Sequence, residues 1–176
     1  MRRVLVCLVV LVSCFAGAQE QKPMTLKAVL LEQLRSTHNK AEWFVPANTA
    51  VAGLTPAQAS WMDKSGNHSV GQLANHLVYW NRNALMQFKG EKPPKFNGNN
   101  DETFNDFDAK SWAKTVVDLD AVMTEWETAV AAADDAKIAL WASMIAHVGA
   151  HNAYHIGQIV YVRKLEGVWD PAKGVK

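Results

Sequence analysis

Apolar residues recur at intervals of three and four along most of this chain, and that spacing places them on one face of an α-helix. A first helix is predicted over residues 24–52, with a break or kink at Pro46, because proline lacks a backbone donor and clashes with the preceding turn. Thr55 and Pro56 have the residue types favoured at an N-cap and in a first turn, and they predict a short helix that ends near Trp61.

Three longer helices are predicted in the rest of the chain. One begins at Ser69, which forms an S-x-x-Q capping box with Gln72, and it continues to about Lys89. Two others are predicted over residues 109–133 and 139–166. Because no segment sustains an alternation of apolar and polar residues, the predicted fold class is all-α.

The connection over residues 90–108 is long and polar, and it contains two prolines and a pair of adjacent asparagines. A connection of this length can carry the chain from one end of a helix bundle to the other, so that the helices on either side of it run parallel. We therefore expect a four-helix bundle with a long crossover between the second and third long helices.

The first 18 residues have the composition of a secretory signal peptide. Arg2 and Arg3 give a positive start, residues 4–15 are an apolar run, and residues 16–18 form a small-x-small cleavage site. The run is shorter than the about 20 apolar residues that a membrane-spanning helix needs. We therefore expect cleavage after Ala18 and an exported domain, periplasmic or secreted, over residues 19–176.

An alternative interpretation of the same segment is a lipoprotein signal. Leu11-Val12-Ser13-Cys14 has the pattern of a lipobox, in which Cys14 would become lipidated and tether the domain. Both interpretations place the domain outside the cytoplasm.

Composition narrows the chemistry that the mature chain can perform. The two cysteines of the sequence, Cys7 and Cys14, both lie in the predicted signal, so the mature chain has no disulfide, no thiolate nucleophile and no thiolate metal ligand. Without Arg2 and Arg3, the 18 basic residues become 16 against 17 acidic ones, a formal charge of about −1. No basic stripe remains for nucleic-acid binding, and no later segment is apolar for long enough to span a membrane.

Three of the six histidines follow one another at four-residue spacing in the last predicted helix: His147, His151 and His155. An i, i+4 pair on a helix places two imidazoles on one face, where both can reach one ion. In a helical projection, His151 and His155 fall in or next to the apolar arc, whereas His147 lies roughly 60° outside it and is expected at the rim. The arc is formed by Met144, Val148, Ile159 and Val162.

His76 lies at the border of the apolar face of the second long helix, close to Trp80 in projection. It could supply a third ligand from a facing helix, as metal sites in helix bundles require. The competing interpretation is a core histidine with one hydrogen-bond partner, because buried imidazole nitrogens must be satisfied. The other two histidines, His38 and His68, are expected to be exposed.

Three segments match motifs of a known family. They are Gly53-Leu54-Thr55-Pro56-Ala57-Gln58-Ala59, then His68-Ser69-Val70 leading to His76-Leu77-Val78-Tyr79-Trp80, and finally His147-Val148-Gly149-Ala150-His151-Asn152-Ala153-Tyr154-His155-Ile156-Gly157-Gln158-Ile159. The last segment contains the pattern H-x-x-x-H-x-G-Q and is the specific one. On these residues the chain resembles the DinB superfamily, also called DinB/YfiT-like proteins, over nearly all of the mature sequence.

This resemblance implies a four-helix bundle with a crossover between helices two and three. It also implies one metal ion held by a histidine of the second helix and two of the fourth, which correspond here to His76, His151 and His155. Trp80, His147 and Tyr154 are candidates for the pocket or its rim. Nitrogen ligands with an open position fit Zn²⁺, Ni²⁺, Fe²⁺ or Mn²⁺.

Some members of the family that the chain resembles are metal-dependent thiol transferases or isomerases with a small thiol cosubstrate. The leading hypothesis is therefore a metal-dependent enzyme of thiol-transferase or hydrolase type that acts on a small molecule. Any thiol must come from a cosubstrate, and export weakens the thiol hypothesis because small thiols are mainly cytoplasmic. The rival is a non-catalytic metal- or ligand-binding protein of the cell envelope; a bundle without metal is a third interpretation, and a homodimer is a further expectation.

Overall fold

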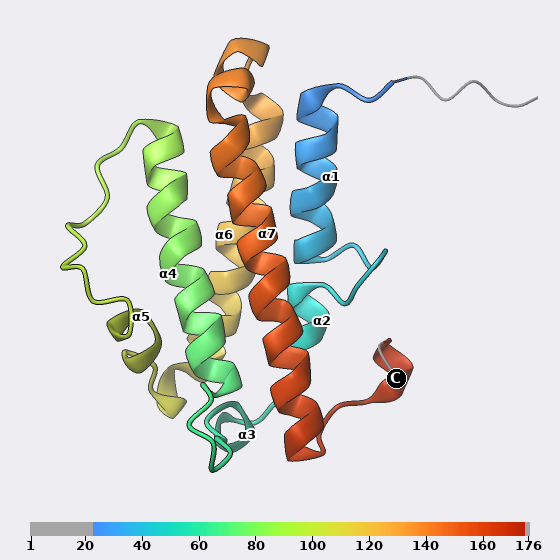
Figure 1. The fold of residues 1–176 in the computed structure, drawn as a ribbon, viewed down its shortest axis with the longest axis vertical. Coiled ribbons are helices and arrows are strands. Elements are labelled where there is room, and N and C mark those ends of the chain that lie inside the picture. Colours follow the sequence, from blue (N-terminus) through green and yellow to red (C-terminus); the bar gives the residue numbers. More distant parts are fainter. Residues whose placement is uncertain (1–22, 175–176) are drawn as a thin grey trace, which may run out of the picture.

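The computed structural model describes residues 23–174, and every regular element among them is helical (Figure 1). The all-α prediction is therefore confirmed for this part of the chain. The predicted signal peptide over residues 1–18 lies outside the described residues. The elements are α1 (Leu26–His38), α2 (Ala47–Val51), α3 (Pro56–Ala59), α4 (Val70–Lys89), α5 (Glu102–Asn105), α6 (Trp112–Ala132) and α7 (Asp135–Glu166), with 3-10 turns at Ala109–Ser111 and Pro171–Lys173.

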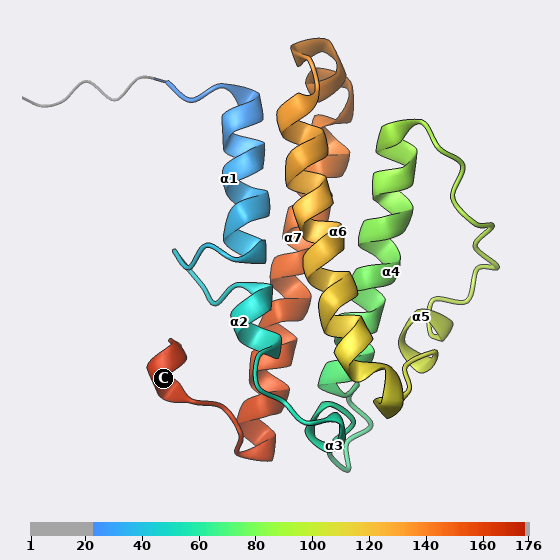
Figure 2. The ribbon, with the colours of Figure 1, turned by 180° about the vertical axis from the view of Figure 1, so that it is seen from behind.

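Helices α1, α4, α6 and α7 lie side by side. Helix α4 packs against α6 and α7, and α1 packs against the same two helices from the other side. Figures 1 and 2 show that α1 and α7 run in one direction and that α4 and α6 run in the opposite one. Residues 90–111 return from the end of α4 to the beginning of α6 at the other end of the molecule, and they carry α5 on the way.

The core between these helices is built from large apolar side chains that burial removes from water. Trp126 of α6 is fully buried, and its indole nitrogen donates a hydrogen bond of 3.0 Å to the backbone oxygen of Asn81 on α4. The ring of Phe88 packs against the same indole. On α7, the residues facing this core include Ile145, Ile156 and Ile159. No helix within residues 23–174 is long and apolar enough to cross a membrane.

Local sequence signals fixed the ends of α4. Ser69 accepts a hydrogen bond from the backbone N–H of Gln72, whose side chain accepts one from the Ser69 backbone, so the predicted capping box is present. Gly90 ends the helix with a positive φ of 81°, a left-handed conformation that glycine adopts without steric cost. The predicted helix over this segment is confirmed.

The prediction of one helix over residues 24–52 was wrong, because α1 ends at His38 and α2 begins only at Ala47. The hydroxyls of Ser36 and Thr37 donate to backbone carbonyls of the preceding turn, and such bonds weaken a helix. Pro46 then stands at the N-cap of α2, a position where its missing N–H costs nothing.

The last helix begins earlier than the predicted residue 139. Asp134 is its N-cap, and the Asp134 carboxylate accepts a hydrogen bond of 2.7 Å from the backbone N–H of Lys137. Only two residues, Ala133 and Asp134, therefore separate α6 from α7. The apolar pattern did not reveal this first turn, because its residues are largely exposed.

Candidate metal centre

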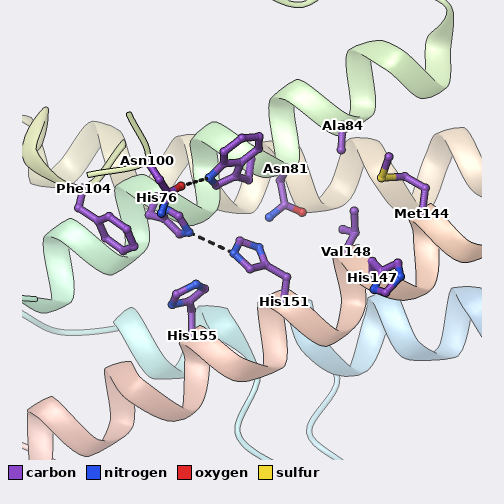
Figure 3. Close-up of a pocket in the computed structure, with 11 residues that line it drawn as sticks. His76, Asn81, Ala84, Asn100, Phe104, Met144, His147, Val148, His151 and His155 are labelled. Atoms are coloured by element: carbon purple, nitrogen blue, oxygen red, sulfur yellow. Dashed lines mark hydrogen bonds between the residues drawn. The ribbon is translucent and has the colours of Figure 1, made fainter. Parts of the chain in front are cut away.

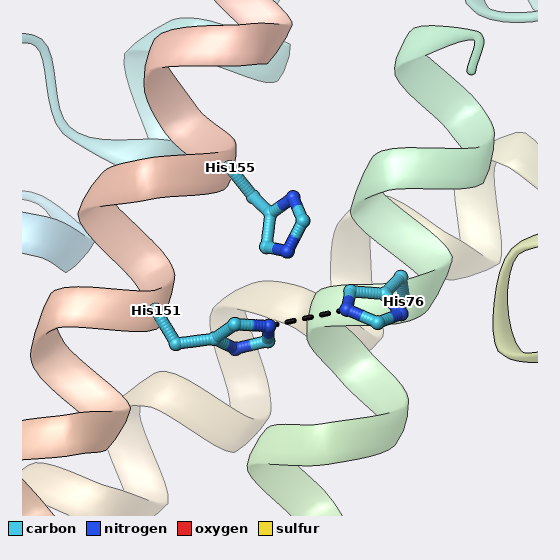
Figure 4. Close-up of side chains that lie close together, drawn as sticks. All are labelled: His76, His151 and His155. Atoms are coloured by element: carbon cyan, nitrogen blue, oxygen red, sulfur yellow. Dashed lines mark hydrogen bonds between the residues drawn. The ribbon is translucent and has the colours of Figure 1, made fainter. Parts of the chain in front are cut away.

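Three imidazoles from two helices converge between α4 and α7. Helix α4 supplies His76, and α7 supplies His151 and His155 (Figure 4). One ring nitrogen from each lies within 4.8 Å of the others, and Nε2 of His76 is 3.1 Å from Nε2 of His151. Two nitrogens that bind one ion at about 2.0–2.1 Å lie roughly 3–3.5 Å apart. The His76–His151 spacing therefore fits two ligands of one divalent ion, and a ring nitrogen of His155 lies within 4.8 Å of both.

A pair of buried amides fixes the two helices that carry these histidines. Asn81 of α4 donates through Nδ2 to Oδ1 of Asn152 on α7 at 2.7 Å, and Asn152 donates back to Asn81 Oδ1 at 3.3 Å. Both residues are buried, so neither amide can exchange its partner for water without a cost. Because Asn152 directly follows His151, this reciprocal contact sets the register of α7 against α4 at the site.

Thr103 determines which nitrogen of His76 carries the proton. The hydroxyl of Thr103 donates to the backbone oxygen of Asn100 at 2.7 Å, so it is left to accept from Nδ1–H of His76 at 2.6 Å. Nε2 of His76 then has a free lone pair directed toward His151. Outer partners of this kind orient metal-binding histidines in many proteins.

Gln158 determines which nitrogen of His155 carries the proton. Its side-chain oxygen accepts a hydrogen bond of 2.6 Å from Nδ1 of His155, one helical turn away on α7, and Nε2 of His155 is left without a proton. The side-chain nitrogen of Gln158 in turn donates to the hydroxyl of Tyr154 at 3.5 Å. Two of the three imidazoles therefore expose an unprotonated Nε2 to the shared centre.

Burial keeps these rings neutral. Burial, together with the smaller effects of the neighbouring His155, His151 and His68, lowers the pKa of His76 to about 3. Burial and His151 lower the pKa of His155 to about 4, against the opposing effect of the Gln158 hydrogen bond. Burial also lowers the pKa of His151. Near neutral pH the imidazolium forms are therefore absent, and the rings need not lose a proton before they bind a cation.

A row of stacked rings supports His76 from the crossover segment. The ring of Phe104 in α5 stacks on His76 with a centroid distance of 3.8 Å, and His68 stacks on Phe104 at 3.9 Å. His68 is half-buried by this contact, so the prediction that it would be exposed was wrong. The segment that contains α5 thus holds His76 by both a hydrogen bond and a ring face.

A cavity of about 430 Å³ opens beside the three histidines (Figure 3). Its lining contains no aspartate, glutamate, lysine or arginine among the residues that the structure describes. The lining residues are His76, Trp80, Asn81, Ala84, Asn100, Phe104, Met144, His147, Val148, His151 and His155.

Of the three residues predicted at the pocket or its rim, two line the cavity and one does not. Trp80 lines the cavity, and its indole nitrogen donates to the Asn100 side chain at 3.1 Å. His147 is exposed and lines the cavity on the side of Met144 (Figure 3). Tyr154 lies outside this lining and is 64% exposed, although its ring centroid is 5.0 Å from that of His155.

A protein-family model, described as the DinB superfamily, matches residues 47–159, which is more than half of the chain. The chain belongs to the DinB superfamily. The matched range contains His76, His151 and His155 and the whole crossover segment. No match was found among curated proteins or among solved structures.

Sequence reasoning missed several residues that shape this DinB site. Gln158 belongs to the H-x-G-Q pattern, so its contact with His155 could have been anticipated from the one-turn spacing. Thr103 and Phe104 gave no such signal, because they lie in a polar connection whose path only the folded chain defines.

His38 was expected to be exposed, and this prediction was wrong. The side chain is 2% exposed, with Nδ1 2.6 Å from Glu127 Oε1 and Nε2 2.8 Å from Asp120 Oδ1. Both ring nitrogens already have a carboxylate partner on α6. His38 therefore joins α1 to α6, and neither ring nitrogen is left open to a metal.

Proposed function

We propose that this DinB-superfamily protein is a metal-dependent enzyme of thiol-transferase or hydrolase type. In this proposal His76, His151 and His155 hold one divalent ion. The observation that supports it most strongly is the convergence of three neutral imidazoles, one pair of ring nitrogens 3.1 Å apart, on the wall of a cavity large enough for a small molecule.

The donor set fits a late divalent metal. Three imidazole nitrogens are the protein ligands of a familiar kind of catalytic site, in which at least one position stays open for water or substrate. Zn²⁺, Ni²⁺, Fe²⁺ and Mn²⁺ all accept such ligands. A divalent ion bound there would supply a Lewis acid that polarises a carbonyl or lowers the pKa of a bound water or thiol.

The protein's own residues orient the histidines and cover part of the site. Thr103 and Gln158 each hold one imidazole in the tautomer whose Nε2 is free. Phe104 covers one face of His76, and Trp80 is held against the cavity by its bond to Asn100.

A non-catalytic metal- or ligand-binding protein is the second candidate. It is supported by the shortage of titratable groups, because the only such side chains in the described lining are the histidines. Three of these are assigned to the ion, which leaves His147 as the sole candidate for proton transfer.

We also propose that the described helices form the four-helix bundle with a long crossover that the family resemblance implies. The parallel course of α4 and α6 and the long return between them support this assignment. Export through a cleaved signal is a further proposal, supported by the sequence of residues 1–18 alone. Mass spectrometry of protein recovered from the envelope fraction would locate the first residue and distinguish cleavage after Ala18 from lipidation at Cys14.

Metal analysis of the purified protein tests the proposed function. We expect one divalent ion per chain, loss of that ion in His76→Ala, and retention in His147→Ala, which alters the same cavity without removing a proposed ligand. An anomalous-scattering map then separates the two candidates: three protein ligands plus water support an enzyme, whereas four protein ligands support storage or structure. Absence of bound metal after loading would refute both.

A further inference from the structure

The wall of the cavity carries no compensating charge for a divalent ion. None of the eleven lining residues is acidic, and the three proposed ligands are imidazoles, which bring no negative charge to an ion. An ion held by neutral imidazoles keeps both of its positive charges. That charge favours an anionic donor in the open position over a neutral one.

Away from the histidines, the cavity is apolar. Ala84 and Met144 lie toward the end farthest from His155, and Val148 lies between that end and His151 (Figure 3). Trp80 contributes an aromatic surface to the same lining. A volume of about 430 Å³ is near the lower end of the roughly 300–1,000 Å³ common for ligand pockets, so the occupant is small.

Apart from His147, which is exposed at the Met144 end, the same wall offers no partner to a second charged group. The amide nitrogen of Asn81 is already engaged by the Leu77 carbonyl and by Asn152, and the amide oxygen of Asn100 already accepts from Trp80. Among the described residues, no lysine or arginine lines the cavity to pair with a second anion, and no acid to pair with an ammonium group. A second charge along Trp80 and Val148, away from His147, would therefore lose its water without gaining a partner.

We propose that this cavity takes a small ligand with one anionic donor group at the ion and an aromatic or aliphatic body along Trp80, Met144 and Val148, and that it discriminates against ligands with a second charge. The inference rests on the proposed metal-dependent function. It narrows the substrate class: a hydrophilic, multiply charged peptide thiol does not fit this wall, whereas an apolar thiolate or carboxylate does.

Calorimetric titration of the zinc-loaded full-length protein tests the inference by binding, without an activity assay. We expect 3-phenylpropanoate to bind about tenfold or more tightly than propanoate, because its ring leaves water for an apolar wall. Adding a second carboxylate, as in 3-(4-carboxyphenyl)propanoate, should remove that gain. A parallel comparison of 2-phenylethanethiol with glutathione repeats the test of a second charge with a thiolate as the donor.

A charge placed on the apolar wall should reverse the preference. Met144→Lys introduces a cation on a long, flexible stem, and we expect it to raise the affinity for the dicarboxylate several-fold relative to that for 3-phenylpropanoate. Leu140→Lys is the matched control, because Leu140 lies one turn earlier on α7, is 80% exposed and does not line the cavity. It should leave the preference unchanged.

The outcomes separate this inference from the function on which it rests. A protein that binds no zinc refutes the metal-dependent function. A zinc-loaded protein that binds the dicarboxylate or glutathione as tightly as the matching apolar ligand, or that binds none of these probes measurably, overturns the proposed ligand class while the metal site stands.

Discussion

Histidines are buried in two regions of this molecule, and their surroundings differ in charge. Between α1 and α6, each ring nitrogen of His38 has a carboxylate oxygen within 2.8 Å. Between α4 and α7, the outer nitrogens of His76 and His155 bond to a hydroxyl and an amide oxygen, both neutral. Their inner nitrogens face one another and His151.

This difference shows that burial alone does not mark a metal ligand. Carboxylates contact both ring nitrogens of His38, so neither nitrogen is left open to an ion. A neutral acceptor on one side only, as at His76 and His155, fixes one proton and leaves the opposite nitrogen free. The partners of the outer nitrogen therefore decide whether a buried histidine can bind a cation.

The largest expected difference between the two regions is in zinc affinity, when one histidine of each region is replaced by alanine. His155→Ala should lower the affinity for Zn²⁺ by more than about 100-fold, beyond the 10–100-fold that loss of an outer hydrogen-bond partner costs. His38→Ala should leave the zinc affinity unchanged. Competition with a chromophoric chelator measures both affinities, and a similar loss in the two variants would abolish the distinction.

A smaller effect is expected when the outer partner of a ligand is removed. Thr103→Val keeps the shape of the side chain but cannot accept from Nδ1–H of His76, so the zinc affinity should fall about 10–100-fold. Thr128→Val is the control, because the Thr128 hydroxyl bonds only within α6 and is exposed. The nitrogen chemical shifts of His76 should also lose the pattern of a ring protonated at Nδ1; an unaltered pattern in Thr103→Val would contradict this role.

Between α1 and α6, where carboxylates contact His38, the expected effect is on the stability of the fold. His38→Gln removes a double donor from Glu127 and Asp120, and the free energy of unfolding should fall by about 2 kcal/mol, as for hydrogen bonds to charged groups. This loss is smaller than the about 3–5 kcal/mol that removal of one partner from a fully buried ion pair costs, because water reaches both carboxylates. Urea unfolding measures it, and a variant as stable as the wild type would show that this contact contributes nothing.

A last effect is expected in the pH dependence of the metal-free protein. The pKa of His76 is lowered to about 3 and that of His155 to about 4, whereas a histidine in an unfolded chain titrates near 6.5. Between those values the unfolded chain binds more protons, so the free energy of unfolding decreases as the pH falls from about 6.5 toward 4. Each histidine contributes a slope of at most about 1.4 kcal/mol per pH unit.

Urea titrations at several pH values should therefore give a shallower decline for His155→Asn than for the wild type. Above about pH 6.5 these histidines are neutral in both states, and the two proteins should show the same dependence. Equal slopes below that pH would mean that His155 does not resist protonation in the folded chain.

Part of the site followed from the sequence because helical spacing is local. The four-residue interval between His151 and His155 places their rings one turn apart on any α-helix, and a projection suffices to show that both face inward. Their convergence with His76, by contrast, needed the family resemblance or the structure. The border position of His76 on its own helix fits a core histidine equally well.

Other expectations failed where distant segments decide the outcome. Nothing near His38 in the sequence indicates Asp120 and Glu127, which lie on another helix and explain its burial. The same holds for Thr103 and Phe104, since a long polar connection can follow many paths of similar local energy.

The sequence by itself determined the helical class and the ends of α4, because capping boxes, left-handed glycines and apolar periodicity act over a single turn. It also determined that residues 19–176 contain no cysteine, so no thiolate in that range can hold a metal. Only the tertiary structure decided which histidines keep a free lone pair, since the protonated nitrogen of each ring is set by a partner. For His76 that partner is Thr103, 27 residues away in the chain, and such contacts form only when the whole chain is packed.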